Sequence, residues 1–156
     1  MKFKILSKDD LSHLEEELKH FLIANGVSNE EWIDMNENNP DKAIDLVELF
    51  SDVVYQKVFE QLKFVEHQSK DALLVFKCDK EEIRLIGVNV KKGMPGDLSS
   101  PEKIQETMKD HVESLEIFRS VKPYSKDREM EVFKMVESGC VNSHEAFWIQ
   151  LEKLFN

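Results

Sequence analysis

The stretch "ALLVFKCDKEEIRLIGVNV", residues 72–90, decides the fold. Two runs rich in β-branched and aromatic residues, 72–78 and 83–90, flank the polar segment "DKEE". This pattern predicts a β-hairpin. We expect the core face of the hairpin to carry Leu74, Phe76, Ile86, Val88 and Val90. Because a lone hairpin is only marginally stable, other parts of the chain must support it.

The longest helix is expected at about residues 40–65, where Asn39 and Pro40 supply a cap and a first-turn proline. Apolar residues, among them Ile44, Val53 and Val58, fill more than half of its circumference. A helix so widely apolar is expected to lie at the centre of the fold. The segment "KFKIL", residues 2–6, can add a third strand to the hairpin.

Capping residues and breakers predict five further helices. They are expected after Ser7 and ending at "NG" (25–26), after Ser28, and over about 101–119, 126–138 and 144–155, behind Ser100, Ser125 and Ser143. The segment 91–100, "KKGMPGDLSS", is a predicted loop. The fold class is therefore α+β in a single domain, residues 1–156. About six helices surround a long central one, and a small antiparallel β-hairpin or three-stranded sheet lies to one side.

Charge and cysteine usage exclude several classes of function. The chain of 156 residues has 31 acidic and 21 basic residues, a formal net charge of −10, and residues 1–66 hold fifteen acids against seven bases. Such a surface repels nucleic acid and anionic lipid, and no apolar run approaches the ~20 residues of a bilayer span. The two cysteines show no metal or disulfide spacing. We therefore expect a cytoplasmic protein with no nucleic-acid or membrane partner.

Two longer stretches resemble a known family. They are "KPYSKDREMEVFKMVESG" (122–139) and "LFSDVVYQKVFEQLKFVEH" (49–67), at a fixed spacing from the "VFKC" strand. Together they resemble a family of short bacterial proteins known only as a domain of unknown function. The resemblance implies a shared fold, allows a shared partner site and assigns no reaction.

The turn "KPYSKDR" has the most specific chemistry in the sequence. Its candidate residues for binding an anion or a partner are Lys122, Tyr124, Ser125, Lys126 and Arg128. Cations beside a helix start, where backbone N–H groups are unpaired, can receive a phosphate, a carboxylate or an acidic peptide. The alternative is a structural turn in which Tyr124 packs and Ser125 caps the next helix.

The histidines give weaker indications. In "HLEEELKH" (13–20) the two imidazoles lie about 10 Å apart along a helix, too far to share one metal ion, so we expect a solvated face, no metal and no cofactor. His111 lies on the apolar side of its predicted helix and is either a core histidine or a general base. His67 closes the long helix, as a structural residue or as a base for Cys78. No catalytic constellation emerges.

These observations favour a non-enzymatic interaction or regulatory protein with a protein partner. The alternative is a small enzyme or an anion- or metabolite-binding protein with its site near the hairpin and the "KPYSK" turn. A hairpin with an open edge can also pair across a two-fold axis, which would give a homodimer.

Overall fold

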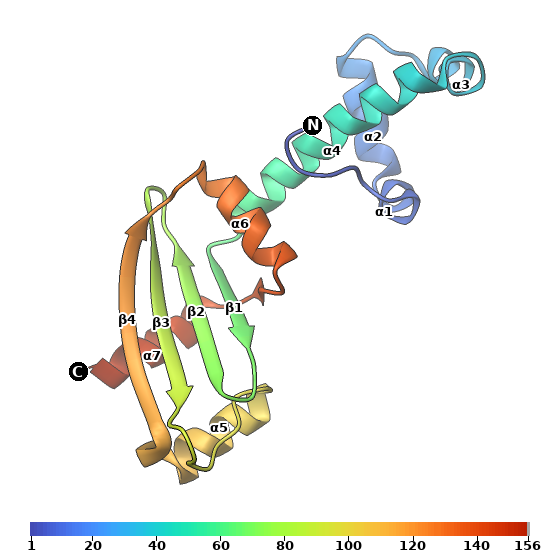
Figure 1. Cartoon of the computed structure of the whole chain (residues 1–156). Helices are drawn as coiled ribbons and strands as arrows, with labels where there is room; N and C mark the ends of the chain where they lie inside the picture. Colours follow the sequence, from blue (N-terminus) through green and yellow to red (C-terminus); the bar gives the residue numbers. More distant parts are fainter. Residues whose placement is uncertain (156) are drawn as a thin grey trace. The chain divides into compact units, whose positions relative to one another are not determined.

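The computed structural model describes residues 1–155 and confirms an α+β fold (Figure 1). The chain divides into two compact units, Met1–Phe59 and Glu60–Asn156. Across the described residues there are seven α-helices and one five-stranded antiparallel sheet. The sheet is larger than the predicted hairpin or three-stranded sheet.

The first unit is helical. Its helices are α1 (Lys8–His13), α2 (Glu15–Ala24), α3 (Asn29–Asn38) and nearly all of α4 (Pro40–Gln61). The predicted caps are confirmed, since the Ser7 and Ser28 side chains accept hydrogen bonds from the backbone N–H groups of Asp10 and Glu31. The predicted burial of α4 is wrong: Ile44, Val53 and Val58 are 49%, 42% and 44% exposed. The buried residues of α4 are Ala43, Phe50, Ser51 and Phe59.

The N-terminal segment is not a strand. The backbone N–H groups of Lys2 and Phe3 donate to the carboxylate of Asp52, at 2.6 and 2.9 Å, and that of Leu6 donates to Ser51 Oγ at 2.9 Å. Side chains of α4 therefore bind the backbone groups that a strand would have used in a ladder. The Asp52 carboxylate therefore anchors the N-terminus.

The sheet belongs to the second unit, and its order is β4-β3-β2-β1-β5. The strands are β1 (Phe64–Gln68), β2 (Ala72–Cys78), β3 (Glu82–Val90), β4 (Leu115–Pro123) and β5 (Val141–Asn142). The predicted hairpin is confirmed as β2 and β3. The other three strands come from segments that were expected to be helix or turn.

Two predicted helices are shorter than expected. The long helix ends at Gln61, and the following "FVEHQ" pairs with β2. The helix predicted over 101–119 is α5 (Pro101–Asp110), a 3-10 turn (Val112–Ser114) and then β4, which pairs with all of β3. Because β3 presents nine residues for pairing, the ladder stabilises an extended conformation that helical spacing alone does not reveal.

The predicted core face of β2 is also wrong. Leu73 and Val75, both 0% exposed, lie opposite Val88 and Ile86 and share their face, whereas Leu74 and Phe76 point to the other side and are half-buried. The main core cluster consists of Phe64, Leu73, Val75, Ile86, Val88, Leu98, Ile104, Leu115, Trp148 and Leu151. A shift of one residue along a strand exchanges its two faces, so the whole apolar set changes sides.

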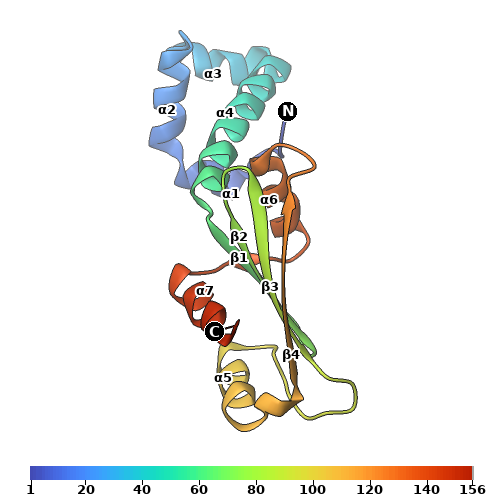
Figure 2. The same ribbon diagram turned by 90° about the vertical axis from the view of Figure 1, so that its left-hand side faces the viewer.

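Helices cover the two faces of the sheet unequally. Figure 2 shows α5 and α7 (Glu145–Glu152) on one side and α6 (Arg128–Glu137) on the other, near one end of the strands. A 3-10 turn (Lys153–Phe155) follows α7. Within the described residues, no helix combines the length and the apolar character that crossing a bilayer requires.

Candidate functional site

The turn between β4 and α6 contains the candidate residues of the "KPYSKDR" stretch. Lys122 lies near the end of β4 and is exposed. The Tyr124 hydroxyl donates to the Asp79 carbonyl oxygen at 2.7 Å, which ties the turn to the β2–β3 hairpin. Burial raises the pKa of Tyr124 well above its ordinary value. Tyr124 therefore fixes the position of the turn as a neutral hydrogen-bond donor.

Two carboxylates of the chain itself already accept hydrogen bonds from backbone N–H groups around the start of α6. Glu131 Oε1 accepts from the backbone N–H of Ser125, from Ser125 Oγ at 2.5 Å and from the backbone N–H of Lys126 at 3.2 Å. The predicted cap Ser125 is replaced by Asp127, whose side chain accepts from the N–H of Met130. An external anion would have to compete with these groups.

The hydrogen bonds from Ser125 are the main cause of a lowered pKa for the Glu131 carboxyl. A depressed folded-state pKa contributes stability above the unfolded-state pKa, about 4.3 for glutamate, and this contribution is lost as the pH falls through the folded-state value. We expect Glu131→Gln to lower the free energy of unfolding by about 1 kcal/mol at neutral pH, and by less at acidic pH, where the wild-type carboxyl is protonated. Urea unfolding at both pH values measures the difference.

Glu106→Gln, at an exposed position of α5, is the matched control and should change stability little at either pH. An equal loss of stability for Glu131→Gln at neutral and acidic pH would contradict the assigned role of the carboxylate.

Arg128 has a structural position. Its side chain is 9% exposed and donates to the Cys78 carbonyl oxygen from Nε at 3.2 Å and from Nη2 at 3.1 Å. Nη2 also donates to the carbonyl oxygen of Leu62. The guanidinium thus joins the start of α6 to the end of β2 and to the residues between α4 and β1.

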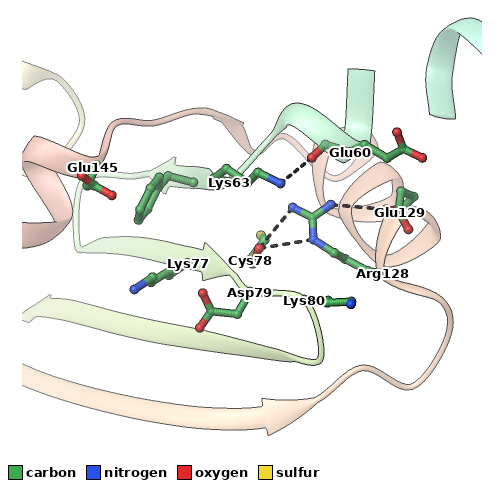
Figure 3. A pocket seen from close by; sticks show the side chains of 10 residues that line it. Glu60, Lys63, Lys77, Cys78, Asp79, Lys80, Arg128, Glu129 and Glu145 are labelled. Atoms are coloured by element: carbon green, nitrogen blue, oxygen red, sulfur yellow. Dashed lines mark hydrogen bonds and ion pairs between the residues drawn. The ribbon is translucent and has the colours of Figure 1, made fainter. Parts of the chain in front are cut away.

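A pocket of about 560 Å³ lies beside this guanidinium (Figure 3). Its lining is Glu60, Lys63, Phe64, Lys77, Cys78, Asp79, Lys80, Arg128, Glu129 and Glu145. Four cationic and four anionic side chains balance one another around it. Lys63 Nζ donates to the Glu60 carbonyl oxygen at 2.8 Å, and Arg128 pairs with Glu129 at 3.7 Å. The pocket therefore has the size of a small-molecule site but no net charge that selects an anion.

Cys78 is poorly suited to nucleophilic chemistry. It is 2% exposed, and burial raises the pKa of its thiol to about 11. His67, the base considered for it, lies on β1 opposite Leu74 of β2, so the side chains of His67 and Cys78 lie roughly 13 Å apart along the strands. The second cysteine, Cys140, is also buried, and burial raises its pKa.

The remaining histidines are dispersed. His111 is half-buried at the C-cap of α5, where its backbone N–H donates to the Thr107 carbonyl oxygen at 2.8 Å. It does not line the pocket beside Arg128. His13 and His20 are exposed. Residues 1–155 contain no cluster of three or more His, Cys, Asp or Glu side chains that could hold a metal ion.

A second hollow, in the helical unit, was not anticipated from the sequence. This groove between α2 and α3 has a volume of about 180 Å³ and a mostly apolar lining. The lining is Glu15, Leu18, Lys19, Leu22, Ile23, Val27, Asn29 and Trp32. Leu22 is 4% exposed, whereas Ile23 is 68% exposed. The one available sequence signal was Trp32, an aromatic residue in α3 four positions after its cap, Ser28.

The groove lies in the most acidic part of the chain. Residues 1–59 contain thirteen Asp and Glu against six Lys, and so carry a formal net charge of −7. Glu15 and Glu16, in the first turn of α2, are 3.8 and 3.7 Å from Lys19 and largely exposed. An apolar hollow within an anionic unit suits a ligand that is apolar on one side and cationic on the other.

The family model described as "Family of unknown function (DUF6495)" matches residues 1–156. The chain belongs to this family. No curated protein and no solved structure matches the chain. The family therefore extends over both units and assigns no activity to either the groove or the Cys78 pocket.

Proposed function

We propose that this DUF6495 protein is a non-enzymatic cytoplasmic interaction protein. In this proposal the groove between α2 and α3 receives apolar side chains of a basic amphipathic helix from another protein. The supporting observation is the apolar groove itself, within a unit of net charge −7. The two unpaired, buried cysteines support the cytoplasmic location.

The size of the groove favours a peptide over a metabolite. Its volume of about 180 Å³ is below the ~300–1,000 Å³ typical of small-molecule pockets. Amphipathic helices bind such grooves through a few apolar anchors spaced three or four residues apart. Leu22 forms the buried floor, and the exposed Ile23 provides apolar surface that a bound helix would cover.

The negative charge of the helical unit favours a ligand whose polar face is cationic. Thirteen carboxylates against six lysines attract a cationic helix over long range and repel nucleic acid. Burial of Ile23, now 68% exposed, would add apolar contact to this attraction. The affinity should therefore depend on both salt and apolar side chains.

The test is a titration with a synthetic helical peptide that carries leucines on one face and lysines on the other, followed by calorimetry. We expect saturable binding that weakens with salt, and at least a roughly tenfold weaker affinity for Ile23→Arg, which puts a cation at the groove. Ile33→Arg is the matched control: Ile33 is 53% exposed in the same unit, does not line the groove and should leave the affinity within about twofold of wild type.

Two results would overturn the proposal. One is equal binding of a scrambled peptide with the same composition, which would reduce the interaction to charge. The other is an equal loss of affinity for Ile23→Arg and Ile33→Arg, which would remove the groove from the interaction.

The alternative function is binding of an anion or a metabolite near the hairpin and the "KPYSK" turn. The supporting observation is the pocket beside Arg128, whose volume of about 560 Å³ lies within the range of small-molecule sites. Native mass spectrometry of protein purified gently from its own cells separates the two functions. A metabolite-sized adduct would favour the pocket, and a stoichiometric protein partner would favour the groove.

A further inference from the structure

The sheet has one long open edge. β4 (Leu115–Pro123) is the outermost strand on one side, and residues 118–123 are all exposed. The opposite edge strand, β5, has only two residues. An open edge of this length presents unpaired backbone groups to any second strand.

The backbone bonding pattern identifies the β4 residues that face outward. The Lys91 N–H donates to the Ser114 carbonyl oxygen at 2.7 Å, and this pair continues the register in which Val90 faces Leu115. Hydrogen-bonded pairs alternate along an antiparallel ladder, so even-numbered residues of β4 bond to β3. The outward N–H and C=O groups belong to Leu115, Ile117, Arg119 and Val121.

We propose that two copies of this chain pair β4 with β4, antiparallel, across a two-fold axis at Phe118. The usable edge is limited by the 3-10 turn Val112–Ser114 and by Pro123, which has no N–H. The segment 115–121 between these limits has Phe118 at its midpoint. All seven residues pair when Phe118 faces Phe118 of the second copy. If the axis shifts by one residue, only five residues of the segment pair.

The side chains agree with this register. Glu116 becomes a diagonal neighbour of Lys122 of the second copy, twice by symmetry, and oppositely charged pairs stabilise such positions. Leu115 faces Val121 of the second copy. The Phe118 ring lies over Gly87 of β3, so closely that a Cβ added to Gly87 would be 2.1 Å from Phe118 Cζ. Phe118 is 38% exposed. An axis at Arg119 would instead set two guanidinium groups directly opposite each other.

The first test is the mass in solution of the full chain and of two variants. Light scattering should give a concentration-dependent mass approaching twice 18.3 kDa. Val121→Pro removes an outward N–H that β3 does not use, so it should give a folded monomer, with folding checked by circular dichroism. Val121→Ala keeps that N–H and should remain dimeric.

The second test reports the register even if the proline variant fails to fold. Under oxidised glutathione Phe118→Cys should form a covalent dimer, because residue 118 faces itself in a non-hydrogen-bonded pair with Cα atoms about 4.5 Å apart. Ser120→Cys should not, because residue 120 faces Glu116. The native Cys78 and Cys140 are buried and should not react.

A monomeric mass at every concentration would overturn the inference, as would equal cross-linking of the two cysteine variants. The inference is independent of the groove. Ile23→Arg should therefore leave the dimer intact, and a dimer that this variant dissociates would place the interface in the helical unit instead.

Discussion

Leu73→Ala is expected to lower the free energy of unfolding by about 3 kcal/mol, because it leaves a cavity in a core that cannot collapse fully. Leu73 is 0% exposed and belongs to the cluster that contains Ile86, Val88 and Trp148. Its neighbour Leu74 points to the opposite face and is half-buried. Leu74→Ala should therefore cost about 1 kcal/mol.

This pair makes a matched comparison, because the same atoms are removed from consecutive residues of one strand. Urea unfolding of both variants measures the difference directly. A larger loss for Leu74→Ala would mean that β2 carries its core face on the side first predicted from the sequence, and the register of the sheet would then be wrong.

Arg128→Met is expected to lower the free energy of unfolding by about 3 kcal/mol, because the carbonyl oxygens of Cys78 and Leu62 lose a charged donor. Methionine retains much of the volume, so the loss reports the hydrogen bonds. Arg128→Lys should cost nearly as much, about 2 kcal/mol, since a single ammonium cannot reproduce the two-sided geometry of the guanidinium.

The control is Arg84→Met. Arg84 pairs with Asp79 at 3.3 Å and with Glu82 at 2.8 Å, but its side chain is 48% exposed. Exposed ion pairs contribute little, so this variant should lower the free energy of unfolding much less than Arg128→Met does. If Arg128→Met were as mild as Arg84→Met, the role assigned to Arg128 would be wrong and its place among the anion-binding candidates would be strengthened.

The candidate site was only partly predictable from the sequence. The residue types of the "KPYSKDR" turn predicted that its side chains would make polar contacts. Tyr124, Ser125 and Arg128 all do so. Their partners lie 6 to 66 positions away in sequence, from Glu131 to Leu62. Sequence cannot tell whether a buried guanidinium will meet an anion or backbone carbonyl groups. The groove was hidden for the same reason, because it forms only where α2 and α3 pack together.

The sequence by itself determined the features that depend on nearby residues. Ser7, Ser28 and Ser100 cap helices, Pro40 begins α4, and the β2–β3 hairpin forms around its polar turn. These interactions involve groups within a few residues of one another, so local propensity and capping were sufficient.

Only the tertiary structure decided the conformation of segments 64–68 and 115–123, whose first residues were predicted to continue a helix. Leu115 and Phe118 continue a helical spacing from Ile104, yet β4 is extended because β3 offers it nine partners in register. The register of the neighbouring β2–β3 ladder likewise places Leu73 and Val75 on the core face. Backbone pairing between distant segments stabilises one conformation over another of similar local free energy, and spacing within a segment carries no information about it.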